Sequence, residues 1–205
     1  MGSNKYDTSR VRAMKVADLP SAGLLNGMCR LSMNDDENLL VSDSFLGAVS
    51  KLNVKTGSFE TTIQDPTMAF VPEVAIVGLN GIRIHQRHLY FASTGRMLFA
   101  RVPIDLKSGK ATGPVEILVE GIIGDDFVLS RDGRRAYLTT NIRNSVLEID
   151  IAAKSSMTLS NSTLLTSATS VTLGRTASDK NSLYFSASST GETGLTGNLV
   201  RLDMS

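Results

Sequence analysis

Tryptophan is absent from the 205-residue sequence, and Cys29 is its only cysteine. One thiol cannot form a disulfide bond within the chain, so the sequence excludes a disulfide-stabilised scaffold. Aromatic residues make up only 5% of the chain, which argues against a stacking platform for sugars or single-stranded nucleic acid. Cys29 lies among apolar residues, and we interpret it as a small buried side chain.

Neither sign of charge dominates, because 21 basic residues stand against 20 acidic ones and no basic block occurs. Nucleic acid is not expected as a partner, since phosphate contacts need clustered Lys and Arg. The longest apolar runs have the length of a strand, so no membrane contact through a spanning segment is expected. The polar residues 1–5 lack a signal-peptide core, which favours a cytoplasmic location. Composition leaves open whether the chain is a monomer or a homodimer.

What the sequence does contain is a fourfold repeat. Each copy opens on a small polar residue, followed by an alternating apolar strand, a turn and a second strand. The polar positions are Asn26, Asn80, Asp125 and Thr169, at spacings of 54, 45 and 44 residues. Strand-only repeats of about 40–50 residues are typical of β-propeller blades. Because blades surround one axis, these four side chains are expected to face one another there.

Each repeat divides into four strands, which predicts an all-β, single-domain β-propeller over residues 1–205. Fourth strands are expected at 59–64, 115–119 and 162–165, and the last repeat ends before reaching one. A spare alternating segment, Val11–Val16, precedes the first repeat and would remove an unpaired edge by pairing at that place. The sequence therefore predicts four four-stranded blades closed by the N-terminal strand. The alternative is an incomplete six-bladed propeller.

Several short stretches, taken in their order and spacing, resemble one protein family. They are Leu24–Met28, Val41–Ser44, Gly78–Gly81, Leu89–Phe91, Gly124–Phe127 and Thr169–Arg175. They resemble the fungal branch of the propellers similar to gluconolactonase, senescence-marker protein and luciferin-regenerating enzyme, which are relatives of strictosidine synthase. The resemblance implies a role in secondary metabolism, because some members of that branch are hetero-Diels–Alderases.

The lactonase members of this family hold a divalent metal on the axis through a first-blade Glu, two Asn and one Asp. The resemblance places the amides at Asn26 and Asn80 and the carboxylate at Asp125, whereas the Glu has no counterpart here. Amide and carboxylate oxygens suit Ca²⁺ or another divalent cation, but a single carboxylate makes a weak site. We therefore expect no cofactor, with a divalent cation on these three residues as the alternative.

The pairs Asn26-Gly27 and Asn80-Gly81 have a second interpretation, because Asn-Gly is a common turn dipeptide. Asp125 and its neighbour Asp126 are expected to point to opposite faces of a strand. An isolated Asp125 in a half-apolar channel would have a raised pKa and could act as a general acid or base.

Four further residues are candidates for contact with a substrate. Met68 and Phe70 belong to an apolar loop, residues 65–73, which is expected either to cover the channel mouth or to pack on a neighbouring blade. Asp43 ends the second strand of its repeat and Asn141 follows another, and both are expected at the other rim of the channel.

Together these patterns favour a biosynthetic enzyme that binds a small, largely apolar natural product at the axis. Asn26, Asn80 and Asp125 would be catalytic and Thr169 would contact the substrate. Orientation and hydrogen bonding would promote a cyclisation or cycloaddition of the hetero-Diels–Alder type. The alternatives are a metal-dependent lactonase, a non-catalytic binding propeller, and a truncated product without activity of its own.

Overall fold

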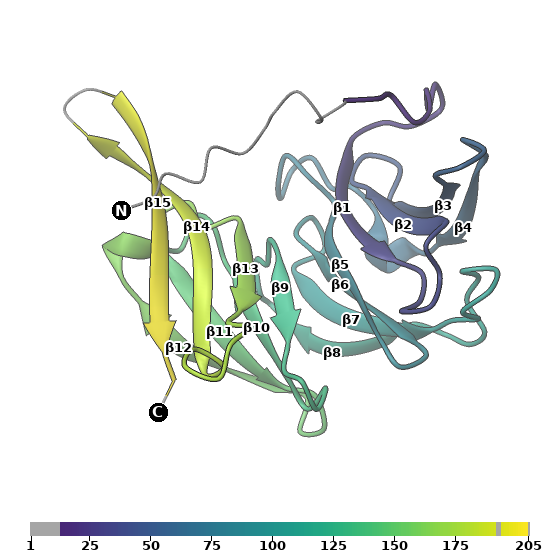
Figure 1. The fold of residues 1–205 in the computed structure, drawn as a ribbon. Helices are drawn as coiled ribbons and strands as arrows, with labels where there is room; N and C mark the ends of the chain where they lie inside the picture. The colour runs from purple at the N-terminus through teal and green to yellow at the C-terminus, as the bar shows by residue number, and fades with distance from the viewer. Residues whose placement is uncertain (1–12, 192–193, 205) are drawn as a thin grey trace, which may run out of the picture.

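The computed structural model describes residues 13–191 and 194–204 and shows four antiparallel sheets arranged as the blades of a β-propeller (Figure 1). The first sheet contains β1 (Leu25–Arg30), β2 (Asn38–Asp43), β3 (Ala48–Asn53) and β4 (Phe59–Gln64). The second contains β5 (Leu79–His85), β6 (His88–Ser93), β7 (Leu98–Pro103) and β8 (Glu116–Glu120). The third contains β9 (Phe127–Leu129), β10 (Arg135–Thr139), β11 (Ser145–Asp150) and β12 (Ser155–Asn161). The last contains, in its described part, β13 (Ser170–Leu173), β14 (Ser182–Gly191) and β15 (Gly194–Asp203).

The first strand of each sheet lies nearest the centre of the propeller. Strand β5 lies between β1 and β9, and β9 lies between β5 and β13. From these inner strands each sheet proceeds outward in sequence order, strand beside strand. The polar residue that opens each repeat is thereby carried to the axis, as the repeat predicts. The four-bladed, all-β fold is confirmed.

The hydrophobic core consists of three clusters, one at each interface between consecutive blades. Successive residues of a strand face opposite sides of its sheet, so a middle strand supplies both neighbouring clusters. In β6, Phe91 packs toward the first blade, whereas Tyr90 packs toward the third. In β10, Leu138 faces the second blade and Tyr137 the last. Burial on both faces explains why these strands are almost continuously apolar.

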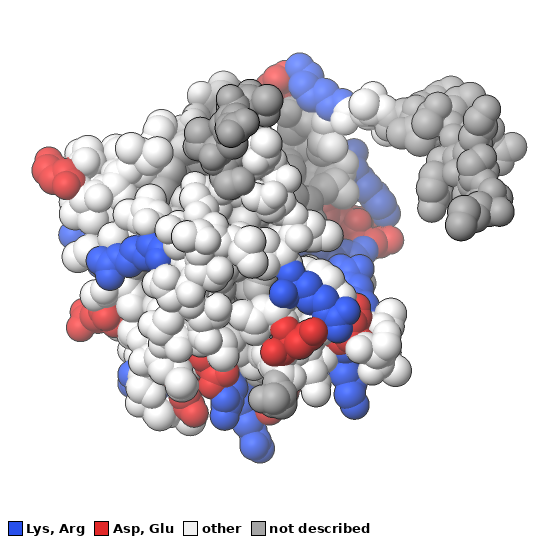
Figure 2. All heavy atoms as spheres, turned by 90° about the vertical axis from the view of Figure 1, so that its left-hand side faces the viewer, with Lys and Arg blue, Asp and Glu red and all other residues white. Residues whose placement is uncertain are grey.

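The side of the molecule on which the last blade lies carries few charges over a wide central area (Figure 2). Acidic and basic side chains are interspersed around it. This face offers no concentrated basic surface. Neither of the short helical segments, η2 (Pro66–Met68) and η3 (Thr163–Leu165), is long or apolar enough to cross a membrane, and the described residues include no other candidate.

The third blade corrects one expected strand. Its fourth strand is β12, and residues 162–165 instead form η3 with Ser162 as its N-cap. The Ser162 hydroxyl accepts a hydrogen bond from the Leu164 N–H at 3.2 Å and begins this 3₁₀ turn. Strand β12 is polar and exposed along most of its length, so it lacks the apolar alternation that marks the other strands.

The N-terminal segment Val11–Val16, which is expected to close the ring, also differs from the prediction. Residues 13–16 are exposed and belong to no strand, so that part of the prediction is wrong, while residues 11 and 12 lie outside the described part of the chain. Lys15 pairs locally with Asp18 at 2.9 Å, and the Val16 carbonyl lies beside the turn at Gly57 in the first blade. No buried side chain holds these residues in a sheet.

Candidate functional site

The two Asn-Gly pairs lie inside strands and form bulges. The pairing of β1 with β2 shifts register between Leu25 and Met28, and that of β5 with β6 shifts between Leu79 and Ile82. Neither Gly27 nor Gly81 has a positive φ, so the interpretation as Asn-Gly turns is wrong. A bulge re-aims the side chains of its strand, here Asn26 and Asn80.

Glycine is needed at these bulges because the inner strands approach backbone to backbone. A Cβ added at Gly27 would lie 2.9 Å from the Asn80 carbonyl oxygen. One added at Gly81 would lie 2.6 Å from an Asp126 carboxylate oxygen and 3.0 Å from its Cα. The Gly81 N–H also donates to the Asp125 carbonyl at 3.0 Å. Neighbouring blades are thus joined at the level of the polar residues.

Two hollows lie along the axis, here called the upper cavity and the lower chamber. Between them lie Asn26, Asn80 and Asp125. All three line an upper cavity of about 400 Å³ and also a lower chamber of about 250 Å³. The structure therefore brings together the three residues predicted to be catalytic. Thr169 borders only the lower chamber, and Asn141 only the upper cavity.

A hydrogen-bond network fixes the polar floor of the upper cavity. The buried Asn80 amide donates to the Thr94 hydroxyl at 3.1 Å, which in turn donates to the Gly124 carbonyl at 2.6 Å. Asn141 donates to the Asp125 carboxylate at 2.9 Å. The more exposed Asn26 amide donates to the Ser44 hydroxyl at 3.1 Å.

Asp125 and Asp126 are adjacent in sequence, but their carboxylates have different partners. Burial raises the pKa of Asp125, the hydrogen bond from Asn141 lowers it, the Asp126 charge raises it and Asn80 lowers it, so the net shift is upward. Asp126 instead forms an ion pair with Arg83 at 2.9 Å and accepts from the Ser170 hydroxyl at 3.1 Å. The upward pKa shift expected for Asp125 is confirmed.

The long loop after β4 does reach the upper cavity, but through residues 74–77. Val74, Ile76 and Val77 line its wall together with Ile123 and Ile142. Met68 is fully buried in the core between the first two blades, because Asp65 caps η2 and turns it inward. The Phe70 ring packs on Phe45 at 5.2 Å between centroids.

Met68 and Phe70 are therefore not among the residues that line the cavity, which corrects their predicted contact with substrate. The apolar run Val74–Val77, directly before Gly78-Leu79-Asn80, was the sequence signal for the true wall. This run has short side chains and comes just before the inner strand β5, which places it at the mouth of the upper cavity.

Asp43 has a structural role in place of the predicted contact with substrate. It is 1% exposed, and its carboxylate accepts hydrogen bonds from the backbone N–H groups of Gly23, Leu24, Phe45 and Leu46 at 2.7–3.1 Å. Burial raises the pKa of Asp43, but these four donors outweigh it and the net shift is downward. Because its carboxylate oxygens accept these four hydrogen bonds, Asp43 stabilises the turn after β2.

Thr94 and Thr140 line the upper cavity and are absent from the sequence-based site. They directly follow the second strands of their blades, at the position that Ser44 occupies in the first blade. In two of these blades the hydroxyl accepts from the axial amide of the same blade, Ser44 from Asn26 and Thr94 from Asn80. Comparing the positions after the second strands of the repeats would have revealed this supporting set.

The axial residues do not fit a divalent metal well. Asp125 is their only carboxylate that lacks a cationic partner, and one of its oxygens already accepts from Asn141. In the lower chamber the Asp126 carboxylate is already paired with Arg83, so it is not a free ligand for a cation. No group of three or more His, Cys, Asp or Glu suitable for a metal occurs in residues 13–191 and 194–204. Ca²⁺ prefers six to eight oxygen ligands, which this donor set does not supply.

Comparison by sequence finds no matching family model and no matching characterised protein. Comparison by structure finds propellers that share the fold. The chain is similar to a luciferin-regenerating enzyme structure with a TM-score of 0.56 and 13% identity, over 82% of this chain and 58% of that one. A nidogen/laminin complex gives a TM-score of 0.55 and 11% identity, with 82% and 60% covered.

Hydrazine synthase of Kuenenia stuttgartiensis gives a TM-score of 0.51 and 15% identity, with 93% of this chain and 49% of that one covered. The chain thus spans less than two thirds of each of these three structures. At these identities the likeness establishes the propeller fold alone, and two of the similar structures are named as enzymes.

Proposed function

We propose that the upper cavity binds a small, largely apolar molecule carrying one hydrogen-bond acceptor. The observation that carries this proposal is the division of the cavity into an apolar wall and a polar floor. The wall is formed by Val74, Ile76, Val77, Ile123 and Ile142, and the floor by Asn80, Thr94, Asp125 and Asn141. Ligand pockets typically combine apolar walls with a few fixed polar groups.

Asp125 is the group at which chemistry would occur. Its raised pKa makes the carboxyl easier to protonate than that of an ordinary Asp, and in the protonated form it can donate a hydrogen bond to a carbonyl oxygen and stabilise negative charge developing there. Asn141 holds the other side of the carboxyl group, and Asn80 and Asn26 orient the bound molecule. Such a site promotes a cyclisation or cycloaddition by orientation and polarisation, and it needs neither a nucleophile nor a metal.

A hetero-Diels–Alder-type cyclisation in secondary metabolism is the reaction class that this site supports best, and the fungal branch of the family remains part of the same proposal. Metal-dependent lactone hydrolysis is less well supported, because the axial donors are too few for the ion. We also propose that the protein is cytoplasmic and that it acts on a small molecule as a monomer or homodimer.

Binding is tested with prodan, an uncharged fluorescent naphthyl ketone. Ile76 is 85% exposed at the cavity mouth, so Ile76→Glu should leave the fold intact while placing a charge beside the apolar wall. We expect prodan affinity to fall about tenfold, whereas Leu164→Glu, at an exposed leucine outside the cavity, leaves it unchanged. Equal affinity in both variants, or no binding to the native chain, would exclude the cavity as the site.

Catalysis is tested separately with a model ortho-quinone methide and an electron-rich alkene. The uncatalysed cycloaddition gives a racemate, so an enantiomeric excess reports turnover inside a chiral cavity. We expect an excess that Asp125→Ala and Ile76→Glu both abolish. Racemic product at the background rate, together with normal prodan binding, would instead establish a non-catalytic binding propeller.

A further inference from the structure

At the opposite end of the axis from the upper cavity lies a broad groove of about 1000 Å³. It is built from the ends of β1 and β5, the turns that follow them, the turn after β7 and the residue Arg175 after β13. Segments from three blades therefore form one surface. The groove shares the lining residues Met28 and Arg83 with the lower chamber.

The charges lining this groove are all positive. They belong to Arg30, Arg83, Lys107 and Arg175, and none of the acidic residues that the structure describes lines it. Arg83 is compensated by Asp126 at 2.9 Å. Arg30, Lys107 and Arg175 are exposed and form no ion pair with any acid of the described chain. Three cations without an ion pair thus line one groove of a protein whose net charge is only +1, and of these Arg30 also interacts electrostatically with Asp35.

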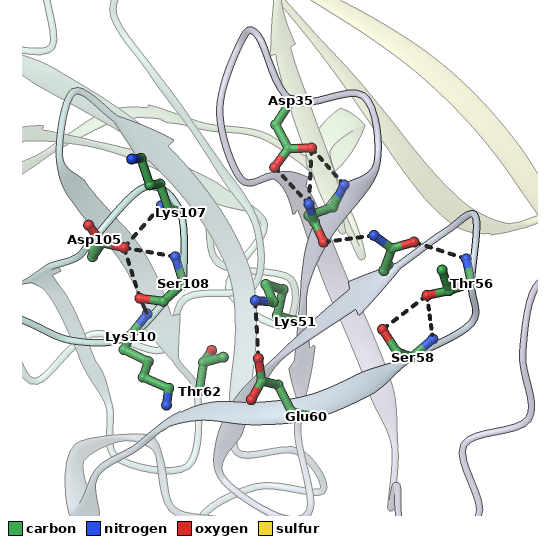
Figure 3. A network of polar contacts seen from close by, with 12 residues as sticks. Asp35, Lys51, Thr56, Ser58, Glu60, Thr62, Asp105, Lys107, Ser108 and Lys110 are labelled. Atoms are coloured by element: carbon green, nitrogen blue, oxygen red, sulfur yellow. Dashed lines mark hydrogen bonds and ion pairs between the residues drawn. The ribbon is translucent and has the colours of Figure 1, made fainter.

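Two acidic residues of the adjoining turns, Asp105 and Asp35, accept hydrogen bonds from their own backbone. The Asp105 carboxylate accepts from the Lys107 and Ser108 N–H groups at 3.1 and 2.8 Å, and the Lys107 side chain extends away from it (Figure 3). The Asp35 carboxylate accepts from the Glu37 and Asn38 N–H groups, both at 2.9 Å. These acids fix the turns that present the cations and form no ion pair with them.

The groove also has an apolar surface. Met28 and Met33 are 60% and 89% exposed, and Ile84 and Leu106 line the same hollow. Burial raises the pKa of the Cys29 thiol to about 12, so this lining residue stays neutral and adds no negative charge. Flexible methionine side chains adapt readily to apolar ligands.

We propose that this groove binds an amphiphilic organic anion, with its acidic group at Arg30, Lys107 and Arg175 and its apolar body on Met28 and Met33. The cations supply charge-assisted hydrogen bonds to a carboxylate or sulfonate, and the methionines cover hydrocarbon. Nucleic acid is a poorer match, because the cations are few and no aromatic side chain of the described residues lines the groove. This inference is independent of the function proposed for the upper cavity.

The test uses 1-anilinonaphthalene-8-sulfonate, an anionic fluorescent amphiphile, with decanoate and decanol as competitors. We expect Lys107→Gln and Arg175→Gln each to weaken dye binding about fivefold. Arg96→Gln removes the same charge from an exposed, unpaired arginine in the turn after β6 and should change binding less than about twofold. Decanoate should displace the dye, decanol should not, and salt should weaken binding.

An equal effect of Arg96→Gln, or equal displacement by decanol, would overturn the proposal because it would show non-specific or purely apolar binding. Loss of dye binding in Ile76→Glu would assign the dye to the upper cavity and overturn it as well. Prodan distinguishes the two sites, since Lys107→Gln should leave prodan binding unchanged. Failure of one proposal therefore leaves the other standing.

Discussion

The first and second blades carry the same Asn-Gly pair at equivalent points of their inner strands, but the pairs have different surroundings. Strand β5 lies between β1 and β9, and Asn80 is only 3% exposed. Strand β1 has β5 as its one described inner neighbour, and Asn26 is exposed. The comparison shows that the burial of a repeated motif depends on the strands on either side of it.

The largest contrast should come from an aromatic side chain on an inner strand with two neighbours. Phe127 of β9 is fully buried and packs edge-on against Phe99 of the second blade, at 4.8 Å between ring centroids. Phe127→Ala should lower the free energy of unfolding by about 4 kcal/mol, because it leaves a cavity between two blades. Met28→Ala on β1, at a 60% exposed side chain, should cost less than about 0.5 kcal/mol in the same urea titrations. Similar costs would mean that β1 is buried in solution.

The bulge glycines sharpen the comparison. Gly81→Ala places a methyl group against Asp126, whose strand is held in turn by the last blade, and should cost about 2–3 kcal/mol. Gly27→Ala meets the Asn80 carbonyl at a similar distance, but β1 can move away on its open side. We expect about 1 kcal/mol there. A larger loss for Gly27→Ala would show that the first blade is the more rigid one.

Replacing the axial amides should also destabilise the second blade more than the first, but with smaller losses than the glycine substitutions. Asn80→Ala removes a buried donor to Thr94 and to Asp125 and should cost about 1–2 kcal/mol. Asn26→Ala removes an exposed donor to Ser44 and should cost about 0.5 kcal/mol or less. Thermal unfolding followed by circular dichroism would compare the two variants. Equal losses would contradict a difference set by the neighbouring strands.

Repeat spacing and strand alternation were sufficient to predict the four sheets and the meeting of Asn26, Asn80 and Asp125. These features depend on period-2 patterns and on the symmetry of the ring, both of which are visible in the sequence. Strand β12 escaped prediction because it is polar and is held mainly by its pairing with β11.

Other parts of the site depended on contacts between distant residues. Asp43 was misassigned because its donors Gly23 and Leu24 come from a chain segment that returns to it in space. The basic groove could not be read from the sequence, since Arg30, Lys107 and Arg175 are widely separated and no run of basic residues precedes or follows them. Only the packing of three blades makes them neighbours.

The smallest expected effect concerns the two adjacent carboxylates, Asp125 and Asp126. Replacing each by Asn should change the stability of the fold in a different way as the pH varies. Because burial raises the pKa of Asp125, its protonated form stabilises the fold, fully below the ordinary pKa of 3.8 and less as the pH rises through the raised value. Asparagine is uncharged and can still accept from Asn141, so Asp125→Asn should be slightly more stable than the native chain at pH 7. This difference in stability between the variant and the native chain should disappear as the pH falls toward the ordinary pKa of 3.8. Urea titrations across that pH range would measure it.

Asp126→Asn provides the contrast at the neighbouring position. It weakens the ion pair with Arg83, so it should lower stability at pH 7 where Asp125→Asn raises it. If Asp125→Asn were the less stable of the two, with a gap that did not narrow in acid, the carboxylate at the axis would be a satisfied structural anion. The opposite signs would identify Asp125 as a group held at a cost to the fold, which is the property expected of a side chain retained for chemistry.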